Sequence, residues 1–96
     1  MNYKYQLFLI KKEYADQEKE IAEKHERNGR YVDAKKHYFE AAKKYKEAQR
    51  EALEERYNSK GQLVYLKDQA EEMSMEYEYC MMQVDAINRI KYGNNL

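Results

Sequence analysis

The 96-residue sequence has no proline, no tryptophan, three glycines and a single cysteine. With one cysteine, Cys80, no disulfide can form within the chain, and we expect this residue to be a small buried apolar group. Helix breakers are rare while Lys, Glu, Ala and Arg are abundant, so the composition favours an all-α fold. The apolar run at residues 7–10 is far too short for a signal peptide or a membrane span. We therefore expect a soluble, cytoplasmic protein with no membrane span.

An excess of either charge is also missing. Eighteen acidic and eighteen basic residues give a formal net charge of zero. Nucleic-acid-binding domains usually gather basic residues on one face, so we expect no nucleic-acid partner. Opposite charges instead recur four residues apart, as on solvated helix faces, where each pair contributes about 0.2–0.5 kcal/mol. These pairs are Lys19/Glu23, Glu20/Lys24, Lys36/Glu40, Glu40/Lys44 and Lys43/Glu47.

The groups that catalysis or metal binding requires are scarce. His25 and His37 are the only histidines, and with Cys80 they cannot complete the usual four-ligand zinc site. Neighbouring carboxylates such as Glu54 and Glu55 do not face each other on a helix. The sequence contains no Glu-x-x-His motif and no glycine-rich phosphate loop. We expect no enzyme activity, no catalytic residues, no cofactor and no metal.

The segment 31–52 alternates large and small residues at heptad spacing. Its steps of three and four residues place Tyr31, Ala34, Tyr38, Ala41, Tyr45, Ala48 and Ala52 on one helical stripe. Phe39, Ala42, Leu53 and Tyr57 lie beside this stripe and widen it. Because a single partner needs only a narrow stripe, the width predicts a central helix that packs against two others.

Two further segments show the same spacing. In the first, the expected core stripe is Tyr3, Leu7, Ile10, Tyr14, Gln17, Ile21 and His25, with Phe8, Ala15 and Ala22 on its flank. In the last, the stripe is Leu63, Leu66, Ala70, Met73, Tyr77, Cys80, Val84 and Ile87. Turns are expected at Asn28-Gly29 and at residues 58–61.

These elements predict an elongated antiparallel three-helix bundle with up-down-up order. A single domain covers residues 1–92, with helices at about 2–27, 31–57 and 60–91 and a frayed tail at 93–96. The last helix carries a second apolar stripe, nearly opposite its core stripe: Met75, Tyr79, Met82 and Ala86. This stripe is either a binding surface or a homo-oligomer interface; the alternative is that the end of the helix is only partly buried.

The first turn resembles a family signature. The pattern Ala22-x-x-x-Glu26-x-x-Gly29-x-Tyr31-x-x-Ala34-x-x-x-Tyr38-x-x-Ala41 is similar to that of MIT domains, the microtubule-interacting and trafficking modules. The resemblance implies a structural turn in which Gly29 reverses the chain, Tyr31 fills the underside and Glu26 stands where the family usually has Asp. It also implies a binding module, often attached to an AAA ATPase, that captures tails of ESCRT-III-type filament proteins in grooves beside its third helix. The family's Tyr-Leu-x-Arg-Ala-like stretch is only approximated at residues 65–70, and we expect no ATPase domain after the bundle.

We therefore expect a non-catalytic protein-interaction module that binds a helical or extended peptide of a partner protein. The expected partner-binding residues, all on the last helix, are Leu66, Asp68, Met75, Tyr79 and Met82. One alternative is a structural homo-oligomer that associates through the second stripe, from Met75 to Ala86. Another is a tetratricopeptide-like adaptor, although residues 63–96 do not repeat the turn signature about 34 residues later.

Overall fold

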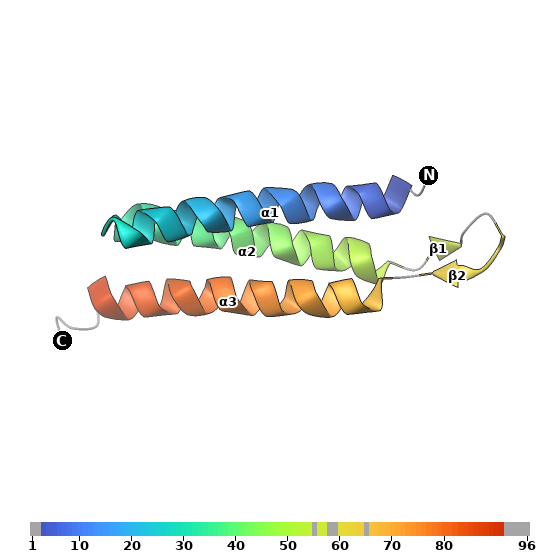
Figure 1. The fold of residues 1–96 in the computed structure, drawn as a ribbon. Helices are drawn as coiled ribbons and strands as arrows, with labels where there is room; N and C mark the ends of the chain where they lie inside the picture. The colour runs from blue at the N-terminus through green and yellow to red at the C-terminus, as the bar shows by residue number, and fades with distance from the viewer. Residues whose placement is uncertain (1–2, 55, 58–59, 65, 92–96) are drawn as a thin grey trace.

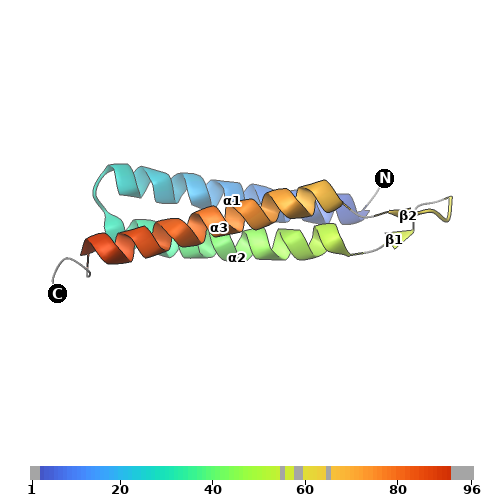
Figure 2. The same cartoon turned by 90° about the horizontal axis from the view of Figure 1, so that it is seen from below.

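The computed structural model describes residues 3–54, 56–57, 60–64 and 66–91. It is an elongated bundle of three antiparallel helices, α1 (Tyr3–Arg27), α2 (Tyr31–Leu53) and α3 (Lys67–Lys91), measuring 59 × 21 × 14 Å (Figure 1). α2 packs along both neighbours, and the view from below shows α3 running along α1 and α2 (Figure 2). The expected three-helix bundle with the tyrosine-bearing helix in contact with both others is confirmed.

The turn between α1 and α2 is built around Gly29. Its φ of +74° is a left-handed conformation that glycine adopts without strain. The backbone N–H of Gly29 donates to the carbonyl of Glu26 at 3.0 Å, and that of Arg30 donates to the carbonyl of His25 at 2.9 Å. This pair of hydrogen bonds is the Schellman arrangement that ends many helices. The predicted reversal at Asn28-Gly29 is thus confirmed.

The connection between α2 and α3 differs from the expected one. α2 ends at Leu53 rather than 57, and α3 begins at Lys67 rather than 60. Between them β1 (Arg56–Tyr57) and β2 (Leu63–Val64) form a short antiparallel pair that extends past the ends of the helices (Figure 1). Aromatic and branched residues favour such extended pairing over helix. The backbone N–H of Leu66 donates to the carbonyl of Ala52 at 2.8 Å and so joins the two helix ends. The expected breaker residues 58–59 and the expected frayed tail at 93–96 lie outside the described residues.

The core follows the predicted stripe of α2. Six of its seven members are fully buried, and Tyr31 is partly buried. The alanines let the neighbouring helices approach, while the rings of Tyr38 and Tyr45 fill the space between them. On the flank Ala42 is buried, but Phe39 and Leu53 are exposed, so the expectation that they widen the core is wrong.

In α1 the expected orientation is wrong. The supposed flank, Phe8, Ala15 and Ala22, is buried, whereas the supposed core residues Ile10, Tyr14, Gln17 and Ile21 face solvent. The tyrosine rings of α2 already fill the space between the helices, so α1 can present only small side chains over most of its length. Phe8 is the exception near the start of the helix, and Ile10, Tyr14 and Ile21 are left outside.

The predicted core stripe of α3 is confirmed along the described helix. Ala70, Met73, Cys80, Val84 and Ile87 are buried, and the partly buried members Leu66 and Tyr77 pack against them. The side chain of Leu63 lies outside the described residues. Burial raises the pKa of the Cys80 thiol to about 12, so the thiol stays protonated near neutral pH.

Candidate functional site

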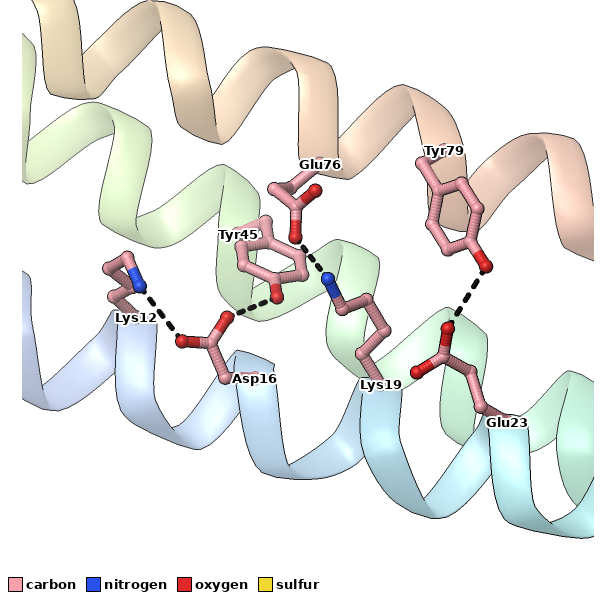
Figure 3. A network of polar contacts seen from close by, with 7 residues as sticks. All are labelled: Lys12, Asp16, Lys19, Glu23, Tyr45, Glu76 and Tyr79. Carbon is pink, nitrogen blue, oxygen red and sulfur yellow. Dashed lines mark hydrogen bonds and ion pairs between the residues drawn. The ribbon is translucent and has the colours of Figure 1, made fainter.

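The side of the bundle where α1 faces α3 is closed by a network of polar contacts (Figure 3). Lys19 of α1 pairs with Glu76 of α3, and the Tyr79 hydroxyl of α3 donates to Glu23 Oε2 of α1 at 3.1 Å. Lys19 therefore pairs across the bundle and not with Glu23, its expected partner on the same helix. Desolvation lowers the pKa of Lys19, but the hydrogen bond to Glu76 and the Glu76 charge outweigh it, so the pKa is raised.

Two tyrosine hydroxyls of α2 also donate hydrogen bonds to carboxylates of α1. Tyr45 donates to Asp16, whose other oxygen accepts from Lys12 Nζ at 2.9 Å, and Tyr38 donates to Glu26 Oε1 at 2.7 Å (Figure 3 shows the Asp16 contacts). Burial and then these carboxylates raise the pKa of both tyrosines well above the usual range. The hydroxyls remain donors at ordinary pH, and they satisfy the carboxylates that α1 turns inward.

Of the five expected partner-binding residues, two pack against the bundle and three are exposed. Leu66 is partly buried against the core, and the ring of Tyr79 packs edge-on to Tyr38 at a centroid distance of 6.3 Å. Asp68 is exposed, and so are Met75 and Met82, at 70% and 68%. The structure thus keeps only the two methionines of the second stripe fully on the outside, because Tyr79 turns toward α1.

The three predicted turn residues lie where α1 meets α2. Glu26 accepts the Tyr38 hydrogen bond and so ties the end of α1 to α2. Gly29 provides the left-handed reversal, and Tyr31 packs partly buried against the core beyond it. These three residues join the first two helices.

A groove of about 380 Å³ runs between α2 and α3 on the side away from α1. From α2 it is lined by Phe39, Ala42, Lys43, Lys46, Glu47 and Arg50, and from α3 by Tyr77 and Met81. Its apolar floor is therefore edged by three cations and one carboxylate. The Lys46 ammonium lies 4.5 Å from the centroid of the Tyr77 ring, and Glu47 is paired with Lys44 at 3.1 Å. We call this the basic groove.

The basic groove was missed by the sequence argument. The sequence argument assigned Phe39 to the widened core. It interpreted the charged residues of this helix as a solvated face. One signal was present: Phe39, Lys43, Lys46 and Arg50 follow one another at steps of four, three and four residues, which places them on one helical face.

A second apolar surface lies on the outside of α1. Ile10, Tyr14 and Ile21 are exposed at 62%, 45% and 40%, with Glu13 and Glu20 beside them and Lys24 next to Ile21. The Lys44 ammonium of α2 lies 5.0 Å from the centroid of the Tyr14 ring, so this surface borders the α1 side of α2. We call the three apolar residues and the two glutamates the acidic face of α1, because two carboxylates stand against one ammonium.

The two histidines meet at the outer corner of α1 and α2. Their rings stack at a centroid distance of 5.4 Å; Arg30 Nε donates to His25 Nδ1 at 2.9 Å, and His37 Nδ1 lies 2.5 Å from Glu18 Oε2. Among the described residues, no cluster of three or more His, Cys, Asp or Glu side chains could hold a metal ion. Within the same part of the chain, no helix is long and apolar enough to cross a membrane.

Comparison with known proteins gives no relative: no family model, no curated protein and no solved structure matches the chain.

Proposed function

We propose that this chain is a non-catalytic protein-interaction module whose basic groove binds one amphipathic helical segment of a partner protein. The observation that carries the proposal is the groove itself, with Phe39, Tyr77 and Met81 accessible from its interior and Lys43, Lys46 and Arg50 around them. Helix-in-groove recognition uses such a surface, with apolar anchors spaced three or four residues apart along the incoming helix.

The charge around the groove defines the class of partner. Three cations against one already paired carboxylate favour a segment with acidic residues beside its apolar anchors. Each buried anchor contributes about 1.5–3 kcal/mol before the entropy cost of association, so three anchors give weak, reversible binding. The cations add mainly to the association rate, and this contribution decreases with salt.

The MIT-like turn suggests where such a segment comes from. By that resemblance, tails of ESCRT-III-type filament proteins are the first candidates, and an AAA ATPase is the associated machinery. We propose the acidic members of such tails as partners, since the groove is edged by cations.

Fluorescence anisotropy tests the proposal. The probe is a labelled helical peptide with leucines three and four residues apart and glutamates beside them, together with candidate filament-protein tails. Phe39→Asp removes an apolar wall, and the double variant Lys43→Glu with Arg50→Glu reverses the rim; we expect each to weaken binding at least tenfold. Met82→Asp is the matched control, because Met82 is an exposed apolar residue on another face. Equal loss of binding in Met82→Asp would move the site to the outside of α3.

A structural homo-oligomer that associates through the outside of α3 is the second candidate. It is favoured by the exposure of Met75 and Met82 on one helical face. Sedimentation velocity separates it from the first, since this candidate requires the wild type to self-associate and Met82→Asp to be monomeric.

A further inference from the structure

We propose that the basic groove of one copy also accepts the acidic face of α1 from a second copy, so that the protein associates head to tail. The inference rests on the proposed function in that it uses the same groove, and it names a further occupant for it. Three features of the described residues carry it: exposed apolar residues on α1, net charges of opposite sign on the two surfaces, and a geometry that excludes pairing within one molecule.

The acidic face of α1 has the form that a groove-binding helix needs. Ile10, Tyr14 and Ile21 stand four and seven residues apart on a helix that is already folded. A preformed helix loses little conformational entropy on docking, in contrast to a disordered peptide. This surface therefore requires no ordering step before it enters the groove.

The two surfaces carry opposite net charge: with Lys24 included, the acidic face of α1 has a net charge of −1, and the basic groove has a net charge of +2. Their outer charges are also equally spaced. Glu13 and Glu20 are seven residues apart on α1, and Lys43 and Arg50 are seven residues apart on α2. At a rise of about 1.5 Å per residue, both pairs are separated by about 10.5 Å along the helix axis. Two ion pairs can therefore form at once when the helices lie side by side. Within the part of the chain that the structure describes, no ion pair engages these four residues.

The two surfaces cannot meet in one molecule. Tyr14 lies beneath Lys44, on the side of α2 that carries α1, whereas Phe39 and Lys46 line the opposite side, next to α3. The contact must therefore join two copies. Because it uses different surfaces on the two partners, each added copy leaves one free groove and one free acidic face, and assembly can continue into a ring or a filament.

Sedimentation velocity over micromolar to millimolar concentrations tests the inference. We expect the wild type to form species larger than a dimer as concentration rises, and to dissociate in high salt. Ile10→Asp removes only the acidic face and Phe39→Asp only the groove, so each variant alone should be monomeric. An equimolar mixture restores a single intact contact and should give a one-to-one heterodimer that grows no further. Met82→Asp serves as the control and should assemble like the wild type.

Charge reversal gives a second test that does not depend on apolar residues. Glu13→Lys with Glu20→Lys should abolish assembly, and adding Lys43→Glu and Arg50→Glu to the same chain should restore it. Circular dichroism of each variant checks that it is folded. A wild type that stays monomeric, a mixture that forms no heterodimer, or assembly lost only in Met82→Asp overturns the inference.

The two proposals fail in different ways. If the wild type is monomeric while the acidic peptide still binds and Phe39→Asp still abolishes that binding, self-association is wrong and the proposed function stands. If the wild type assembles as described but the peptide neither binds nor dissociates the assembly, the groove serves the second copy alone.

Discussion

Tyr45 of α2, whose ring is completely buried, donates its hydroxyl hydrogen bond to Asp16 of α1. The contact explains how a helix with many charged residues packs against the core. Asp16 satisfies the one polar atom of the buried ring, and Lys12 holds the other oxygen of the carboxylate. Polar side chains of α1 thus seal the bundle on one side, while Ile10, Tyr14 and Ile21 face outward.

Tyr45→Phe tests this contact. The variant keeps the ring and removes the hydroxyl, and Asp16 retains Lys12 as a partner. Hydrogen bonds to charged groups contribute about 1.5–3 kcal/mol. We therefore expect the free energy of unfolding, measured by urea titration, to decrease by an amount near the lower end of this range. Tyr14→Phe is the control, since that ring is half exposed, and it should change stability by less than about 0.5 kcal/mol. Equal effects of the two variants would contradict the assigned role.

The buried tyrosines also predict a pH dependence. The pKa of Tyr38 and that of Tyr45 are raised above those of the unfolded chain by burial and then by Glu26 and Asp16. A raised pKa means that the neutral form is favoured in the folded state, so its stabilisation is fully present below the unfolded pKa, about pH 10, and is lost as pH rises above it. Absorbance titration of the phenolates should show these two tyrosines ionising only as the helical circular dichroism signal is lost. Complete ionisation of all tyrosines in a still helical protein would refute the prediction.

Substitutions in α1 test its orientation. Ala22 is fully buried and Ile21 is half exposed. Ala22→Leu adds volume where the α2 rings leave none, and we expect it to lower the free energy of unfolding by about 1–3 kcal/mol. Ile21→Ala should cost less than about 1 kcal/mol. The opposite ranking would restore the orientation that the sequence pattern favours.

The first turn depends on the conformation of one residue. A Cβ at Gly29 would have open space around it, so the expected cost of Gly29→Ala is conformational only. We expect about 1–2 kcal/mol, because the left-handed region is strained for alanine. Gly29→Asn should cost less, since asparagine tolerates this region better. Thermal unfolding of both variants measures the ranking, and an alanine variant as stable as the wild type would be inconsistent with the observed φ.

The sequence predicted α2 well because its stripe is unambiguous. Tyr38 and Tyr45 alternate with alanines, and no competing apolar face of similar strength exists on that helix. α1 has two such faces, and the one with Ile10 and Ile21 is the more hydrophobic. The volume already filled by the α2 rings decides that the face with Ala15 and Ala22 goes inside.

The remaining differences arise from tertiary structure. A two-residue strand pair such as β1 and β2 is too short to produce a recognisable alternation. The basic groove depends on which face of α2 lies beside α3. The spacing of its residues on α2 places them on one face, but it does not show that α3 borders that face. Phe39 therefore looked like a core residue although it lines a groove.

The most direct test of the account is a two-dimensional NMR titration of the labelled protein with the acidic amphipathic peptide. We expect chemical-shift changes that saturate and are concentrated at Phe39, Lys43, Lys46, Tyr77 and Met81, the residues that line the basic groove. Changes concentrated instead around Met75 and Met82, or no saturable change at millimolar peptide, would contradict the claim that this groove is the binding surface.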